Sequence, residues 1–233
     1  KIFGYFCLIV IAISMLYPFF AMLNLSFVPN GEIYNQGGKF FYSPLTYKNY
    51  IDVFHKIPLW KYFINSLFVA TVTTFGQVII SAFAGYAFAR LKFKYRDVLF
   101  LIILITMLVP PQVNILPLFF LMRYLHWINT YQALILPGLF GGFGIFMMRQ
   151  YFLGIPRDLE EAAKIDGCNI FTTFVKIILP VAVPVIATLS IFTFVTTWNS
   201  FMWPLIVTNT ESMRTLPVGL AVFKGSFREI TLW

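Results

Sequence analysis

The sequence predicts an all-α fold: a polytopic transmembrane helical bundle forming a single domain over residues 1–233. Two observations lead to this prediction. Hydrophobic residues make up 59% of the chain and charged residues only 11%, whereas a soluble domain carries about 25% charged residues. The apolar residues also lie in long blocks, and a helix needs roughly 20 of them to cross a bilayer core of about 30 Å. Because lipid cannot hydrogen-bond a backbone, each block is expected to be a helix.

Five blocks are long enough to span a membrane, and the first is too long and wrongly flanked for a cleaved signal peptide. The expected spans lie at about 2–25, 64–89, 98–122, 131–152 and 181–207. A charged insert at 155–180 separates the last two, and an outer loop is expected at 208–228. Pro110 and Pro111 interrupt the third block, so a kink or break is expected there.

Basic residues indicate which side of the membrane is cytoplasmic. Four of them crowd the short connection 90–96, and three more lie in the insert 155–180, on the same side of a five-span chain. Short loops rich in Lys and Arg face the cytoplasm. This pattern accounts for the net charge of +8 without nucleic acid, since no basic stripe with interleaved aromatic residues is present. The spans are expected to lie in a lipid bilayer. The two cysteines, Cys7 and Cys168, do not indicate a disulfide framework.

The charged insert has the local pattern of a helix, a turn and a second helix. Glu160 and Lys164 have the i,i+4 spacing of an ion pair, and acidic residues occupy the positive end of the first helix. Gly167 is expected to end that helix in the left-handed conformation, and Asn169 to cap the next. Composition alone leaves a solvated loop and a docking surface equally open. The apolar face expected on the second helix comprises Ile170, Phe171, Phe174, Val175 and Ile178.

Glu161, Ala162 and Ala163 are followed after three residues by Gly167, after nine more by Ile177, and then by Leu179 and Pro180. This spacing resembles the EAA loop of permease subunits of bacterial ABC importers. The flanks at 65–97, 128–167 and 197–223 are similar to the carbohydrate-uptake branch, the relatives of the second permease subunit of the maltose transporter. Cys168 stands where that family commonly has Ala. The positions of the loop pattern, together with the acid before the glycine, are Glu161, Ala162, Ala163, Asp166, Gly167, Ile177, Leu179 and Pro180.

The resemblance implies a function for the insert as a coupling loop that docks in a cleft of a separate ATPase. The implied partners are a homologous second permease subunit, an ABC ATPase dimer and an extracytoplasmic sugar-binding protein. ATP and Mg²⁺ would be bound by the ATPase, so no cofactor or metal is expected on this chain. The implied location is the cytoplasmic membrane of a bacterium. The family has six spans, so the native protein is expected to continue beyond Trp233 into a sixth.

The expected function is that of a permease subunit in an ATP-driven, binding-protein-dependent importer of a sugar or oligosaccharide. An importer of a polyol or glycerol-phosphate is the nearest alternative. A membrane enzyme using His55 or His126, or a passive channel, represents another class. The sequence holds no GxxxxGK[ST], HExxH or GxSxG motif, and the EAA spacing argues against both alternatives, because neither needs an ATPase dock.

Polar residues inside the spans are candidates for a translocation pathway, since such groups are tolerated where they face protein or water. They are Gln112, Asn114, Trp198 and Asn199. In the resembled maltose system the other permease supplies most sugar contacts. Small residues such as Ser81, Gly85, Gly138 and Gly142 instead fit close helix packing.

The outer loop 208–228 is unusually apolar for a segment in solvent. In the resembled maltose system the corresponding loop reaches into the binding protein. Pro217 and Gly219 are expected to break any helix there, so that Leu216, Val218 and Leu220 are exposed in a loop. The candidates for the contact with the binding protein are Leu216, Pro217, Val218 and Gly219.

Overall fold

The computed structural model describes residues 2–29 and 45–230, and every regular element in those ranges is helical. The chain divides into two compact units, residues 1–59 and 60–233. The first unit holds α1 (Ile2–Ser26) and α2 (Lys48–Lys56). The Asn49 amide joins them by donating to the carbonyls of Ser26 and Val28, at 3.0 and 2.7 Å.

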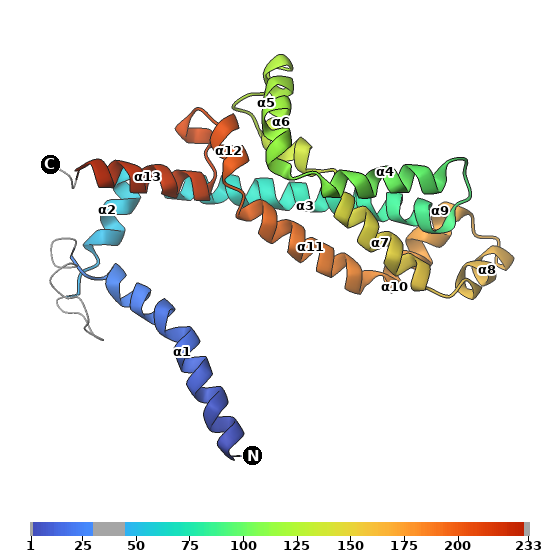
Figure 1. Ribbon diagram of the computed structural model, residues 1–233, viewed down its shortest axis with the longest axis horizontal. Helices are drawn as coiled ribbons and strands as arrows, with labels where there is room; N and C mark the ends of the chain where they lie inside the picture. Colours follow the sequence, from blue (N-terminus) through green and yellow to red (C-terminus); the bar gives the residue numbers. More distant parts are fainter. Residues whose placement is uncertain (1, 30–44, 231–233) are drawn as a thin grey trace. The chain divides into compact units, whose positions relative to one another are not determined.

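The second unit is built on α3 (Leu59–Arg90), a helix of 32 residues. Figure 1 shows α4, α7 and α11 running alongside it, α8 at its carboxyl end and α13 at its amino end. The remaining α-helices are α4 (Arg96–Leu108), α5 (Ile115–Tyr124), α6 (Tyr131–Ile135), α7 (Gly142–Gly154), α8 (Asp158–Ile165), α9 (Ile170–Thr173), α10 (Leu179–Val181), α11 (Val183–Trp198), α12 (Met202–Val207) and α13 (Leu216–Ile230). Short 3-10 turns lie at η2 (Pro111–Asn114), η3 (Leu136–Gly138) and η5 (Glu211–Met213), and η4 (Phe174–Ile178) is a π-helix.

Among the described residues, three helical segments are long and apolar enough to cross a membrane: Phe3–Ser26, Leu59–Arg90 and Tyr131–Gly154. Two further pairs meet this criterion only as bent spans, Arg96–Leu108 with Pro111–Tyr124 at 93° and Ile170–Val181 with Val183–Trp198 at 76°. The 93° bend confirms the break expected at the paired prolines, which lack the N–H groups that would continue the helix.

Two expectations for the carboxyl-terminal part are wrong. The block 181–207 is not one helix, because α11 ends at Trp198 and α12 starts at Met202. The segment 208–228 is not a loop throughout, because α13 starts at Leu216. Pro217 lies in the first turn of α13, where its missing N–H is not needed. Pro217 and Gly219, which suggest a loop in the sequence, therefore both lie within a packed helix.

Close approach between α3 and the segment 138–152 organises the second unit. A Cβ added to Gly85 would lie 2.6 Å from Cβ of Met148 and 2.9 Å from the Arg149 backbone nitrogen. A Cβ on Gly144 would lie 2.4 Å from the Ser81 hydroxyl oxygen. Further along, a Cβ on Gly138 would lie 2.7 Å from Cγ2 of Thr73 on α3. A Cβ on Gly142 would instead lie 2.9 Å from Cγ of Met107 on α4, so the same segment also packs closely against that helix. These contacts confirm that the small residues serve helix packing.

A buried apolar cluster fills the inner part of the second unit. Its largest aromatic members are Tyr86, Phe152 and Phe174, from α3, α7 and η4, whose ring centroids lie 4.7 to 6.2 Å apart. Phe152 and Phe174 are 0% and 2% exposed. Residues from α3, α7 and the second half of the charged insert are therefore held together in one buried cluster.

A hydrogen-bonded asparagine organises the opposite end of α3. Asn65 is 0% exposed, and its amide donates to the carbonyls of Ser212 and Arg214, at 2.8 and 2.9 Å. Its carbonyl accepts from the Tyr131 hydroxyl at 2.8 Å. One turn of α3 thereby holds η5 and the start of α6. Both the NH₂ group and the oxygen of the buried Asn65 amide are hydrogen-bonded within the protein, as buried polar groups usually are.

Gly85→Ala is expected to destabilise the second unit by about 1–3 kcal/mol, because the new methyl group has no room against the backbone of α7. The measurement is thermal unfolding of the detergent-solubilised protein. Gly154→Ala is the matched control, because nothing lies within 4 Å of a Cβ at that position. Equal melting temperatures for the two variants would contradict the close-packing argument.

Asn65→Leu is expected to loosen the segment 208–215. It removes the partners of two carbonyls and one hydroxyl, and each buried group left unpaired costs about 1–3 kcal/mol. Limited trypsin digestion should then cut after Arg214 much faster than in the unaltered protein. Asn209→Leu is the control, because Asn209 lies in the same segment and is exposed. This variant should leave the rate of trypsin cleavage unchanged. No acceleration with Asn65→Leu would show that the amide does not hold this segment.

Candidate functional site

The turn between α8 and α9 has the backbone geometry that the sequence predicts. Gly167 has a φ of 79°. Its N–H donates to the Lys164 carbonyl at 3.1 Å, and the Cys168 N–H donates to the Ala163 carbonyl at 2.9 Å. This pair of bonds is the Schellman arrangement that ends a helix on a left-handed residue. Nothing lies within 4 Å of a Cβ at Gly167, so backbone conformation, not space, requires glycine there.

The second helix of the insert starts as expected but buries only part of its expected apolar face. The Asn169 side chain accepts a bond from the Thr172 N–H at 2.8 Å. Phe174 and Ile178 are buried in the core, whereas Ile170 and Phe171 are 61% and 63% exposed. The π-helical stretch Phe174–Ile178 accompanies this change of face. The insert is therefore anchored by its second half and presents apolar side chains from its first half.

Helix α8 has an inner and an outer face. Ala163 is buried at 2% exposure, which lets α8 lie close to the core. Glu161, Ala162 and Asp166 are exposed. Ile165 is 87% exposed, on the same outer side of α8 as Glu161 and Ala162. The sequence pattern does not include this residue. Its position four residues after Glu161 could have identified it.

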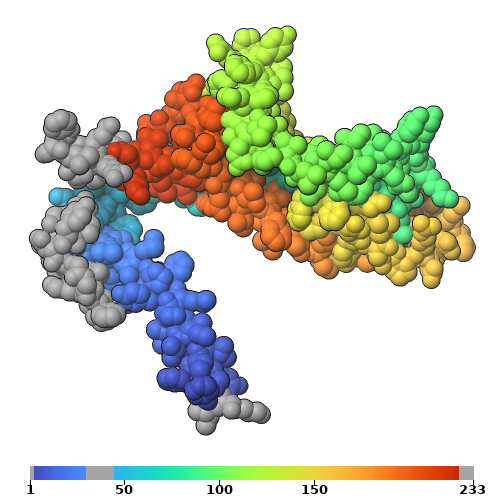
Figure 2. All heavy atoms as spheres, in the orientation of Figure 1, coloured from blue at the N-terminus to red at the C-terminus, as the bar shows by residue number. Residues whose placement is uncertain are grey.

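The other positions of the loop pattern differ in exposure. Gly167 and Pro180 are exposed, whereas Ile177 and Leu179 are half-buried. Figure 2 shows α8 at the end of the second unit, close to the basic connection 90–96. The pattern therefore combines anchoring positions with outward-facing ones. Ile165, which is not part of the pattern, adds an exposed apolar side chain between the exposed acids Glu161 and Asp166.

Glu160 lies on the inner side and faces Arg90, the last residue of α3. The Arg90 Nε and Glu160 Oε1 atoms are 3.4 Å apart, at ion-pair distance but outside hydrogen-bond geometry. The Arg90 side chain is 4% exposed and that of Glu160 21% exposed. The Arg90 guanidinium also donates to the Ile155 carbonyl. The ion pair of Glu160 thus joins α8 to α3, and the expected pair with Lys164 is not among the ion pairs of the described residues.

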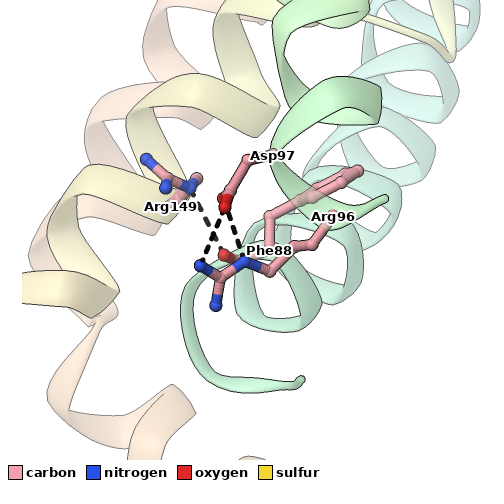
Figure 3. Close-up of polar contacts among 4 residues, drawn as sticks. All are labelled: Phe88, Arg96, Asp97 and Arg149. Carbon is pink, nitrogen blue, oxygen red and sulfur yellow. Dashed lines mark hydrogen bonds and ion pairs between the residues drawn. The ribbon is translucent and has the colours of Figure 1, made fainter. Parts of the chain in front are cut away.

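Two further arginines make contacts near the carboxyl end of α3 and the start of α4 (Figure 3). Arg149 on α7 donates from Nε to the Phe88 carbonyl at 3.3 Å, and its guanidinium lies 4.1 Å from the centre of the Phe100 ring. Arg96 donates to Asp97 at the start of α4, at 3.0 Å. Arg149 therefore connects α3, α4 and α7, whereas the Arg96 pair is local and exposed.

The pathway candidates lie at interruptions of the helices. Gln112 and Asn114 are exposed in η2, directly after the 93° break. Trp198 ends α11, and its ring lies 5.5 Å from that of Phe63. The exposed Asn199 donates back to the Val195 carbonyl at 2.9 Å. A role for these four residues in a pathway stays a prediction.

The candidates for contact with a binding protein are packed against α3. Val218 is 1% exposed, so the expectation that it lies free in a loop is wrong. A Cβ on Gly219 would meet the Tyr62 ring at 2.2 Å, and the Leu216 N–H donates to Ser66 at 2.8 Å. Leu216 and Pro217 are half-buried. These residues are held in place because α13 covers the outer end of α3.

The two histidines, His55 and His126, are the residues named for the alternative of a membrane enzyme. No group of three or more His, Cys, Asp or Glu residues that could hold a metal occurs among the described residues. His126 has a φ of 57°. Its N–H bonds to Arg123 and the Trp127 N–H to Met122, so His126 forms the left-handed end of α5.

Comparison with known proteins identifies the chain. Residues 77–223 match the family described as binding-protein-dependent transport system inner membrane component. The arabinooligosaccharides transport permease AraQ of Halalkalibacterium halodurans is 39% identical over 91% of this chain and 77% of its own. The trehalose/maltose transport permease MalG of Thermococcus litoralis is 35% identical over 95% and 81%. The sn-glycerol-3-phosphate transport permease UgpE of Yersinia pestis is 26% identical over 100% and 85%.

A solved structure has the same fold. The crystal structure of a bacterial ABC transporter involved in the import of the acidic polysaccharide alginate contains a chain that superposes with a TM-score of 0.82. The two chains are 26% identical, over 96% of this chain and 78% of that one. The chain therefore belongs to the inner-membrane components of binding-protein-dependent transport systems, the permease subunits of ABC importers.

Proposed function

We propose that this chain forms half of the membrane passage of an importer that takes up a sugar or oligosaccharide, and that it receives the work of ATP hydrolysis through α8. The observation that carries the proposal is the outer face of α8, where Ile165 is 87% exposed beside exposed Glu161 and Ala162. Such a face suits a partner with an apolar pocket and a basic rim. ATP and Mg²⁺ would be bound by that partner, an ABC ATPase.

The contact between α8 and the ATPase has to be firm because it carries the free energy that moves the gate. Driving a two-state gate from 1:99 to 99:1 takes about 5.5 kcal/mol of differential interaction. A weakly held solute is a poor source of this free energy, so it has to enter through the contact with the ATPase. The Schellman turn at Gly167 and the buried Phe174 and Ile178 keep α8 in a defined place relative to the core. The outer face can then transmit displacement instead of yielding locally.

The substrate class is proposed from the relatives. AraQ and MalG, at 39% and 35% identity, are named for arabinooligosaccharides and for trehalose/maltose. UgpE, named for sn-glycerol-3-phosphate, is 26% identical over the whole chain and supports the alternative solute. The higher identities favour a sugar or oligosaccharide. A homologous second permease and an extracytoplasmic binding protein complete the proposed assembly.

Contact with the binding protein is proposed at the outer end of α3. Because 216–219 pack on α3, the better candidates are the exposed residues of the preceding segment, among them Asn209, Glu211 and Ser212. Asn129 holds this segment, since its side-chain oxygen accepts from the N–H groups of Asn209 and Thr210, each at 3.0 Å. A firmly held outer segment is suited to recognising a rigid partner.

The direct test is transport by the reconstituted assembly. Proteoliposomes containing this chain, the second permease and the ATPase, with the binding protein outside, should take up arabinooligosaccharide, maltose or trehalose when ATP is inside. Glycerol 3-phosphate is tested in parallel, and its uptake without that of any sugar would select the alternative solute. ATP-independent flux of all these solutes would instead indicate a channel.

Glu161→Lys is expected to weaken ATPase binding by roughly tenfold or more, because a hydrogen bond to a charged group contributes about 1.5–3 kcal/mol. Uptake should fall accordingly, while insertion and pairing with the second permease persist. An acidic substitution at the basic partner residue on the ATPase should restore part of the affinity. The measurement is pull-down of the ATPase, with Asp97→Lys as an exposed control of the same charge change. Full affinity in Glu161→Lys would remove this residue from the dock.

Gly167→Val is expected to abolish uptake while leaving the chain inserted. A branched side chain in the left-handed region costs about 1–2 kcal/mol, so the turn would rearrange and move α8. Coupled uptake and ATP hydrolysis are measured in the same vesicles. Gly154→Val is the control, because a Cβ there also meets nothing within 4 Å and Gly154 is not among the positive-φ glycines. Normal uptake in Gly167→Val would show that the bend is not required.

A further inference from the structure

Arg90, at the end of α3, contacts both α8 and the connection between α7 and α8. Arg90 pairs with Glu160 on α8 at 3.4 Å and donates to the carbonyl of Ile155, which connects α7 to α8. Arginine is suited to this double role, because its planar guanidinium carries several donors in a fixed geometry. A lysine ammonium could not hold both partners in the same way.

Burial distinguishes the Arg90–Glu160 ion pair from the nearby Arg96–Asp97 ion pair. The Arg90 side chain is 4% exposed, whereas the side chains of Arg96 and Asp97 are 32% and 73% exposed. Exposed pairs contribute little because water screens them. Loss of one member of a buried pair leaves a charge without its counterion, which is strongly unfavourable. The position of α8 relative to α3 therefore depends on Arg90 and Glu160 together.

Glu160 and Glu161 are adjacent but point to different surroundings. Glu161 is exposed on the outer face, and Glu160 is only 21% exposed and faces Arg90. An open surface pocket of about 710 Å³ lies beside the pair, and its lining includes Tyr86, Cys168 and both charged residues. Packing alone thus does not fill the space next to α3, and the ion pair lies on the wall of this pocket.

We infer that Arg90 is a positioning residue that transmits displacement of α8 to α3, the helix that extends from the insert to the outer end of the second unit. The inference rests on the proposed function of α8 as the ATPase dock. A push or pull on the outer face reaches α3 through Glu160 and Arg90. Without the pair, the ATPase still docks and hydrolyses ATP, but the motion is absorbed in the pocket.

The test uses the complete transporter in proteoliposomes and a double-mutant cycle. Arg90→Gln and Glu160→Gln should each lower the amount of solute imported per ATP hydrolysed by at least about tenfold, which corresponds to about 1.4 kcal/mol of lost coupling. The double variant should be no worse than either single one, because the two residues act as a unit. Arg96→Gln is the matched control and should retain the unaltered ratio. ATPase pull-down should stay normal throughout.

Unaltered import per ATP in both single variants, or losses that multiply in the double variant, would overturn the inference. If Arg90→Gln does not assemble, Glu160→Gln decides, with alkylation of Cys168 as the second measurement. In a Cys7→Ser background, Cys168 should react faster with a maleimide once the pair is lost, and an unchanged rate would count against the inference. If the unaltered chain itself fails to bind the ATPase, the proposed function fails. The Cys168 measurement on the isolated chain would still report whether the pair holds α8.

Discussion

The close contact between α3 and the segment 138–152 is the constraint on which the rest of the second unit depends. Gly85 and Gly144 let α3 and α7 approach so closely that backbone and Cβ atoms of one helix contact the other. In lipid, apolar side chains gain nothing by leaving solvent, so close packing and hydrogen bonds must hold helices together. Because this contact is rigid, α3 can carry separate attachments at its two ends.

Those two attachments use different chemistry. At the outer end, Asn65 makes neutral hydrogen bonds to η5 and to Tyr131, and its amide is completely enclosed. At the inner end, Arg90 and Glu160 form an ion pair beside a surface pocket. A satisfied, enclosed amide rigidifies its surroundings, whereas the ion pair connects α8 to α3 at the edge of an open pocket. This difference is in keeping with the proposal that displacement of α8 reaches α3 through Arg90.

Local features of the insert were predictable because they depend on few neighbouring residues. The left-handed Gly167 and the cap by Asn169 follow from backbone preferences within one turn. The break after Val109 follows from two consecutive prolines. By contrast, Glu160 was assigned to Lys164 by helical spacing, although Arg90, which precedes it by 70 positions, is its partner in the fold. Helical spacing alone does not reveal that Glu160 faces α3 and Glu161 faces outward.

The sequence by itself determined that the chain is a helical membrane protein, that its charged insert is a bent helix pair, and that its spacing is that of an ABC importer permease. These properties depend on composition, on backbone conformation and on a pattern within 26 consecutive residues, 155–180. Only the tertiary structure decided which acid faces inward, that Ile165 is exposed, and that 216–219 form a packed helix. Each of these depends on side chains brought together from distant parts of the chain, and burial against a partner can override the local preference of proline and glycine.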